Sequence, residues 1–112
     1  MKSTDLTGKK CVPCEGGTKP LTEGEFARYL RAVPAWNTPD DLSITKDFKF
    51  KDFAEALQFV NQVGEIAQHE DHHPDIFLHN WNKVKITLST HAIKGLSIND
   101  FIVAAKIDLV AS

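Results

Sequence analysis

Residues 75–89, DIFLHNWNKVKITLS, hold the pattern that decides the fold. Apolar residues alternate with polar ones on both sides of a short Asn80-Trp81-Asn82 link: Ile76 and Leu78 before it, and Val84, Ile86 and Leu88 after it. A period of two predicts strands with one buried face, because successive side chains of a strand point to opposite faces. The short link favours a hairpin between the two strands.

The pattern outside this hairpin predicts two more strands and three amphipathic helices. Residues 44–50 alternate in the same way, and Trp36-Asn37 is expected to begin a strand before residues 39–41 turn the chain. Helices are expected from Thr22 to Pro34, from Asp52 to the histidine run, and from Ser97 onward. The order α-β-β-α-β-β-α predicts an α+β fold in which a four-stranded antiparallel sheet carries three helices on one face.

Length and composition indicate one domain. The 112 residues, 42% of them hydrophobic, suffice for a single core, which we place at 21–112 after an irregular extension at 1–20. A net charge of −2 does not favour binding to nucleic acid or to an anionic membrane. No apolar run resembles a signal peptide or a membrane span, so a cytoplasmic protein is expected.

Histidines gather where one helix is expected to end. The run His69-Glu70-Asp71-His72-His73-Pro74 closes the second helix, and His91 follows the strongest strand. Adjacent His72 and His73 should point in different directions. A hairpin returning from Pro74 would bring His91 back toward them. Three histidines are therefore expected to converge on one pocket, at side chains that exchange protons near neutral pH.

Three interpretations of this cluster remain open from its spacing. It is a solvated helix end, a zinc site built on three histidines, or a metal-free site for acid–base catalysis. Zinc binding is disfavoured because the ligands do not lie on one uninterrupted helix. The pair Cys11 and Cys14 could likewise be a redox pair or half of a zinc site, although a breaker-rich extension is an unusual place for either.

A set of motifs resembles the pterin-4a-carbinolamine dehydratase family, bacterial type, over roughly residues 22–110. The combination of His-His-Pro with a later Ser-Thr-His and Gly-Leu-Ser is specific, and the N-terminal cysteines are also similar to those of bacterial members. The matching segments are His72-His73-Pro74, Trp81-Asn82-Lys83-Val84, Thr87-Leu88-Ser89-Thr90-His91, Lys94-Gly95-Leu96-Ser97 and Asp100-Phe101. The chain departs from the family pattern at Gln68, where many relatives carry an acidic residue, and at Ile76, where some carry an aromatic one.

The resemblance implies dehydration of 4a-hydroxytetrahydropterin to quinonoid dihydropterin, without a metal or other cofactor. It implies that His73 is the main acid–base residue, that His72 contacts the pterin and assists, and that His91 is the third catalytic member. Asp100 could orient a histidine. The positions expected to bind substrate are Asp71, Pro74, Trp81, Ser89, Thr90 and Asp100.

The same resemblance implies partners. A homodimer or homotetramer is expected, and phenylalanine hydroxylase is the expected functional partner, whose pterin cofactor the reaction would recycle. Animal members also act as dimerisation partners of a transcription factor. A protein-binding dimerisation or coactivator module of the same fold is therefore the alternative function, although all three histidines of the site are present here.

Overall fold

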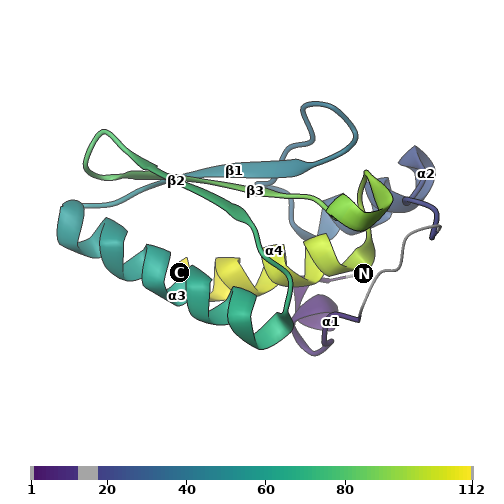
Figure 1. Ribbon diagram of the computed structural model, residues 1–112, viewed down its shortest axis with the longest axis horizontal. Coiled ribbons are helices and arrows are strands. Elements are labelled where there is room, and N and C mark those ends of the chain that lie inside the picture. The colour runs from purple at the N-terminus through teal and green to yellow at the C-terminus, as the bar shows by residue number, and fades with distance from the viewer. Residues whose placement is uncertain (1, 13–17, 112) are drawn as a thin grey trace.

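The computed structural model describes residues 2–12 and 18–111. In chain order its elements are α1 (Ser3–Thr7), α2 (Glu23–Ala32), β1 (Ile44–Lys49), α3 (Phe53–Glu70), β2 (Asp75–His79), β3 (Lys83–Leu88), the 3-10 turn η1 (His91–Ile93) and α4 (Ile98–Ala111). The sheet forms one layer, and α3 and α4 lie along one of its faces (Figure 1). The α+β class is confirmed.

The sheet has three strands within the described residues, so the prediction of four was wrong. The strand order is β1-β3-β2, and both pairings are antiparallel. The expected first strand shrinks to one bridge between Asn37 and Thr45. Pro39, two residues after Asn37, lacks a backbone N–H, and the carboxylate of Asp40 accepts hydrogen bonds from the N–H groups of Leu42 and Ser43. The chain therefore turns after a single bridge, and among the described residues no further strand pairing forms on this side of β1.

The predicted hairpin is present and sets the register. Val84 lies opposite Phe48 of β1 and Leu78 of β2, and Ile86 lies opposite Lys46 and Ile76. Val84, Ile86 and Leu88 are fully buried against the helical layer. The hairpin turns through Asn80 and Trp81, both with positive φ.

Side-chain caps determine where the helices begin, as the sequence predicted. Thr22 accepts a hydrogen bond from the N–H of Glu25, and the Glu25 carboxylate accepts one from the N–H of Thr22. Asp52 caps α3 through the N–H of Glu55. Ser97 and Asp100 make the corresponding contacts at the start of α4.

Helices α3 and α4 pack their apolar side chains into the core but each leaves a few exposed. In α3, Ala56, Phe59, Val63 and Ala67 are buried, whereas Phe53 and Leu57 are exposed. Helix α4 is buried on most sides, since α1, α2 and α3 all pack on it. Near its C-terminal end, Leu109 and Val110 are exposed. A helix covered on most sides has no single apolar stripe to reveal its orientation.

The N-terminal segment, predicted to be irregular, contains helix α1. Leu6 of this helix is fully buried in the core. Cys11 lies in the described part of the chain, whereas Cys14 lies outside the described residues. Among the residues that the structure describes, no helix is long and apolar enough to cross a membrane.

Candidate active site

The site begins where α3 ends. The helix stops at Glu70, and Asp71 adopts the left-handed conformation with φ 51°. The N–H groups of Asp71 and His72 both donate to the carbonyl of Ala67, so the end of the helix is closed by backbone hydrogen bonds. The turn at Asp71 sends His72 and His73 into different surroundings, as the sequence predicted for adjacent residues outside a helix.

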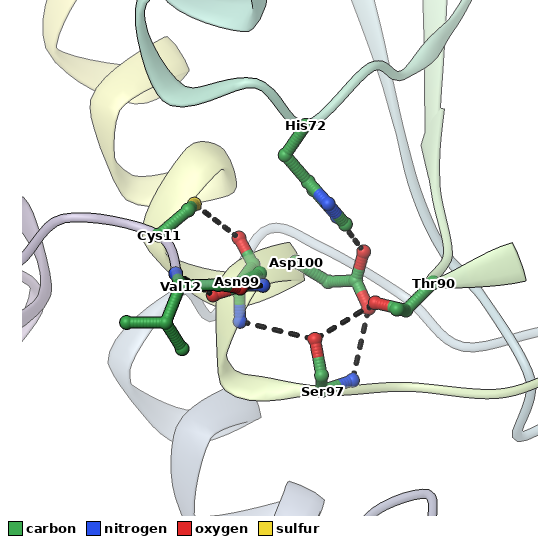
Figure 2. Close-up of polar contacts among 7 residues, drawn as sticks. All are labelled: Cys11, Val12, His72, Thr90, Ser97, Asn99 and Asp100. Carbon is green, nitrogen blue, oxygen red and sulfur yellow. Dashed lines mark hydrogen bonds and ion pairs between the residues drawn. The ribbon is translucent and has the colours of Figure 1, made fainter. Parts of the chain in front are cut away.

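His72 is held by a buried carboxylate. Its Nε2 lies 2.6 Å from Oδ1 of Asp100, whose side chain is completely buried, while the His72 side chain is 11% exposed. The other oxygen of Asp100 accepts hydrogen bonds from the hydroxyl of Thr90 at 2.9 Å and from the N–H of Ser97 at 3.0 Å. Figure 2 shows Asp100 between these donors.

The hydrogen bonds around Asp100 have a definite direction. A carboxylate only accepts, so Nε2 of His72 donates and its Nδ1 is left as the acceptor of the neutral ring. Because the Thr90 proton points at Asp100, the Ser97 hydroxyl, 2.7 Å from that of Thr90, must donate to it. The N–H of Asn99 donates to the Ser97 oxygen in turn. This network selects one tautomer of the neutral His72 ring.

His73 has a weaker partner. It is exposed, and its Nε2 lies 3.0 Å from Oε1 of Gln68, one turn back on α3. Gln68 is the position at which many relatives were expected to carry an acid. Here a neutral amide orients His73, so the ring is positioned without a neighbouring negative charge at that nitrogen.

His91 begins the 3-10 turn that follows β3. Thr90 and Gly95 form an isolated bridge across this turn, and Lys94 is left-handed with φ 56°. A Cβ on Gly95 would lie 2.7 Å from Cβ of Pro20, so only glycine fits there. The close approach ties the turn to the chain before α2 and sets where exposed His91 lies.

The three histidines line one cleft of about 540 Å³. The histidines come from the C-terminal end of α3 and from the turn after β3, while other residues come from the N-terminal segment. The lining residues are Lys10, Cys11, Val12, His69, Glu70, Asp71, His72, His73, Ser89, Thr90, His91, Ala92 and Asn99. The cleft is large enough to hold a small heterocyclic ligand.

The structure brings some predicted site residues to this cleft and not others. Asp71, Ser89 and Thr90 line it, and Asp100 lies beneath it as the partner of His72. Pro74 is half-buried beyond His73 and is not part of the lining. Trp81 was expected near the pocket, but it lies at the tip of the hairpin and is 62% exposed. The hairpin starts beside the end of α3 and its tip lies near the start of that helix, where Asn82 forms hydrogen bonds with Phe50, so Trp81 is carried away from the histidines.

Sequence reasoning missed the wall formed by Lys10, Cys11 and Val12. Burial, reinforced by the nearby charge of Glu70, raises the pKa of the Cys11 thiol to about 12. Burial also tends to raise the pKa of Glu70, but hydrogen bonds from Cys11 and Lys106 outweigh it and hold that pKa below its ordinary 4.5. No sequence signal marked the wall, because an aperiodic segment does not reveal where it docks.

The possible metal ligands of the cleft are its histidine, cysteine and acidic side chains. Within residues 2–12 and 18–111, no three side chains of histidine, cysteine, aspartate or glutamate gather in a group that could hold a metal ion. In His72, Nε2 forms a hydrogen bond with Asp100, and in His73, Nε2 forms one with Gln68. Each ring therefore has only its Nδ1 without one of these partners.

Comparison with known proteins decides the family. Residues 19–110 match the family model described as pterin 4 alpha carbinolamine dehydratase. The match covers most of the chain and includes all four histidines that line the cleft. The chain belongs to this family. The resemblance inferred from the histidine, Ser-Thr-His and Gly-Leu-Ser motifs is thereby confirmed.

Individual members of the pterin-4a-carbinolamine dehydratase family match over nearly the whole chain. A relative assigned to it in Rubrobacter xylanophilus is 46% identical over 105 residues, covering 94% of this chain and 97% of its own. One in Alkaliphilus metalliredigens is 49% identical, covering 93% and 94%. The crystal structure of a transcriptional coactivator/pterin dehydratase from Brucella melitensis superposes with a TM-score of 0.78 at 38% identity, covering 84% of this chain and 100% of that one.

Proposed function

We propose that this chain is a cytoplasmic enzyme that dehydrates 4a-hydroxytetrahydropterin by histidine acid–base catalysis. The observation that carries the proposal is the 2.6 Å hydrogen bond between His72 and buried Asp100, in the cleft that His73 and His91 also line. A family assignment gives the substrate class, and the cleft supplies groups that can bind and move protons.

The reaction needs two proton movements and no net redox change. The C4a–O bond breaks, the hydroxyl leaves as water after receiving a proton, and N5 loses its proton as the N5–C4a double bond forms. One proton is removed and one is delivered, so the enzyme returns to its starting state. Imidazoles suit both movements, because their ordinary pKa of about 6.5 is close to neutral pH.

The two environments divide the work between His72 and His73. An imidazole with one nitrogen committed to a buried carboxylate keeps one orientation, so we assign His72 to binding the pterin and assisting. The exposed ring of His73 exchanges protons readily with water, which a residue must do between turnovers. We therefore assign the main acid–base role to His73.

Other residues complete the proposed site. His91 lines the cleft from the turn after β3, and we assign it to the departing hydroxyl. Asp71, Ser89 and Thr90 are the proposed substrate-binding residues that line the cleft. Asp100 is a positioning residue, since it acts through His72. Pro74 contributes by stiffening the backbone after His73.

The physiological setting follows from the substrate. Dehydration of a 4a-hydroxytetrahydropterin would return the pterin cofactor of an aromatic amino acid hydroxylase, and phenylalanine hydroxylase is the proposed functional partner. We propose a homodimer or homotetramer, because β1 and β2 are edge strands of a small sheet. The exposed apolar side chains of Phe53, Leu57 and Phe77 are further surface that an oligomer could cover.

Stopped-flow absorbance tests the activity directly. The decay of 4a-hydroxytetrahydropterin is followed with protein that has been treated with a chelator. Acceleration that survives chelation is expected for metal-free histidine catalysis. Acceleration that is lost with the chelator and restored by zinc would mean that the histidines are metal ligands.

The same experiment addresses the alternative function. The Brucella melitensis relative is described both as a transcriptional coactivator and as a pterin dehydratase. If the protein is folded and oligomeric by light scattering but does not accelerate the decay, the dehydratase proposal fails. The conclusion would then be a protein-binding module of the same fold.

A further inference from the structure

The N-terminal segment is anchored before it reaches the cleft. Leu6 of α1 is completely buried in the core, and α1 packs on α4. The N–H of Lys9 donates to the carbonyl of Leu6, which closes this helix. The next three residues, Lys10, Cys11 and Val12, then line the cleft beside the histidines.

Two side chains hold Cys11 and Val12 in place. Asn99, which is buried, accepts a hydrogen bond from the N–H of Val12 at 3.1 Å through Oδ1 and donates Nδ2 to the carbonyl of Val12. The side-chain amide of Asn99 thus satisfies both the N–H and the carbonyl of Val12, as the backbone of a neighbouring strand would. The N–H of Cys11 donates to Oε1 of Glu70 at 2.8 Å.

Glu70 is itself locked. Its side chain is almost completely buried, and its other oxygen accepts a hydrogen bond from the ammonium group of Lys106 at 2.9 Å. The carboxylate is thus shared between the N-terminal segment and α4. Moving Cys11 away would leave a buried charged oxygen without one of its donors, which costs free energy.

Both anchors are close in sequence to the residues that orient His72. Asn99 precedes Asp100 at the start of α4, and Glu70 lies two residues before His72 at the end of α3. Figure 2 shows Cys11 and Val12 on one side of Asn99, and His72 and Thr90 on the other. The same two helix ends therefore position the N-terminal segment and the histidine side of the cleft.

Building on the proposed pterin substrate, we propose that Lys10, Cys11 and Val12 form a binding wall of the pterin cleft, held beside the histidines by the positioning residues Asn99 and Glu70. The wall contributes to substrate affinity and not to proton transfer. The Cys11 thiol, with its raised pKa, stays protonated at neutral pH and is a poor base. A loosened wall should therefore raise KM and leave kcat nearly unchanged.

Alkylation of Cys11 tests contact between the wall and a bound pterin. The chain has two cysteines, so a Cys14→Ser background leaves Cys11 as the one thiol. The rate of alkylation by iodoacetamide is measured with and without 7,8-dihydrobiopterin, a stable reduced pterin. Saturating pterin is expected to slow alkylation about fivefold or more, because bound ligand covers the thiol and disfavours opening of the wall.

Substitution of Asn99 tests the anchor. In Asn99→Ala, loss of the paired amide should raise the Cys11 alkylation rate and KM about fivefold to tenfold, the equivalent of one or two hydrogen bonds, with kcat within about twofold. Asn61→Ala is the matched control, because Asn61 is an exposed residue of α3 outside this cleft. It should change none of the three quantities.

The outcomes separate this inference from the proposed function. Normal turnover without pterin protection of Cys11 would overturn the wall and leave the dehydratase standing. Equal losses of kcat and kcat/KM in Asn99→Ala would also overturn it, since the anchor would then act on the chemistry. Absence of both turnover and protection would overturn the two proposals together.

Discussion

His72 and His73 are adjacent in the chain, yet they lie in opposite environments. His72 is 11% exposed and bonded to a completely buried carboxylate, which is fixed by two further donors. His73 is exposed and bonded to the neutral amide of Gln68. The left-handed turn at Asp71 ends α3 just before the pair, so neither histidine lies on the helix.

The comparison shows how one short segment provides both a rigid and an accessible imidazole. Rigidity requires buried partners from elsewhere in the fold, and for His72 these come from the start of α4 and the end of β3. Accessibility requires only that the chain emerge from the helix into solvent. Substitutions at and around the site should therefore affect catalysis and stability to different extents.

His73→Ala should have the largest effect, and it should be on catalysis. We expect kcat to fall by about 10²–10⁴, the range for loss of a general acid or base. The free energy of unfolding should change by no more than about 0.5 kcal/mol, because the side chain is exposed. Stopped-flow kinetics and urea unfolding measure the two quantities. Near-normal kcat would contradict the assignment of the main role to His73.

Asp100→Ala should instead affect stability strongly. Three donors, on His72, Thr90 and Ser97, lose their acceptor in a buried place, and we expect a loss of about 3 kcal/mol in the free energy of unfolding. Urea unfolding measures it, with Asp75→Ala as the control because Asp75 is exposed on β2. If the two variants were equally stable, the buried network would not hold the site together.

Glu70→Gln should reveal a smaller, pH-dependent effect. The pKa of Glu70 is lower in the folded protein than its ordinary 4.5, so folding favours the charged form. Its contribution to stability is therefore present above pH 4.5 and is lost as the pH falls through the folded pKa. The stability difference between wild type and variant should shrink over that range.

Urea unfolding at a series of pH values checks this expectation. Exposed Glu65→Gln provides the control, for which the difference should be much flatter with pH. A difference for Glu70→Gln that does not vary with pH would contradict the role of the charged Glu70 in binding Lys106 and the N-terminal segment.

Trp81→Ala should have the smallest effect of the four. The side chain is 62% exposed at the hairpin tip and does not line the cleft. We expect KM and kcat to change less than about twofold and the free energy of unfolding to change by about 0.5 kcal/mol or less. A large rise in KM, measured by the same stopped-flow assay, would show that the hairpin tip contributes to a site, as the sequence had suggested.

Much of the fold could be predicted because its signals are local. Thr22 with Glu25 and Asp52 with Glu55 mark helix starts through contacts within one turn. The alternation of Val84, Ile86 and Leu88 requires only that one sheet face be buried. The expected strand at Trp36 failed because one bridging residue cannot form a ladder when a turn follows immediately.

The sequence by itself determined the family, the hairpin and the gathering of His72, His73 and His91, since these rest on motifs and on neighbours along the chain. Only the tertiary structure decided that Asp100 holds His72, that Gln68 contacts His73, and that Lys10, Cys11 and Val12 line the cleft. Such contacts join residues up to 88 positions apart, as between Cys11 and Asn99. They depend on how helices pack, and no local periodicity records that.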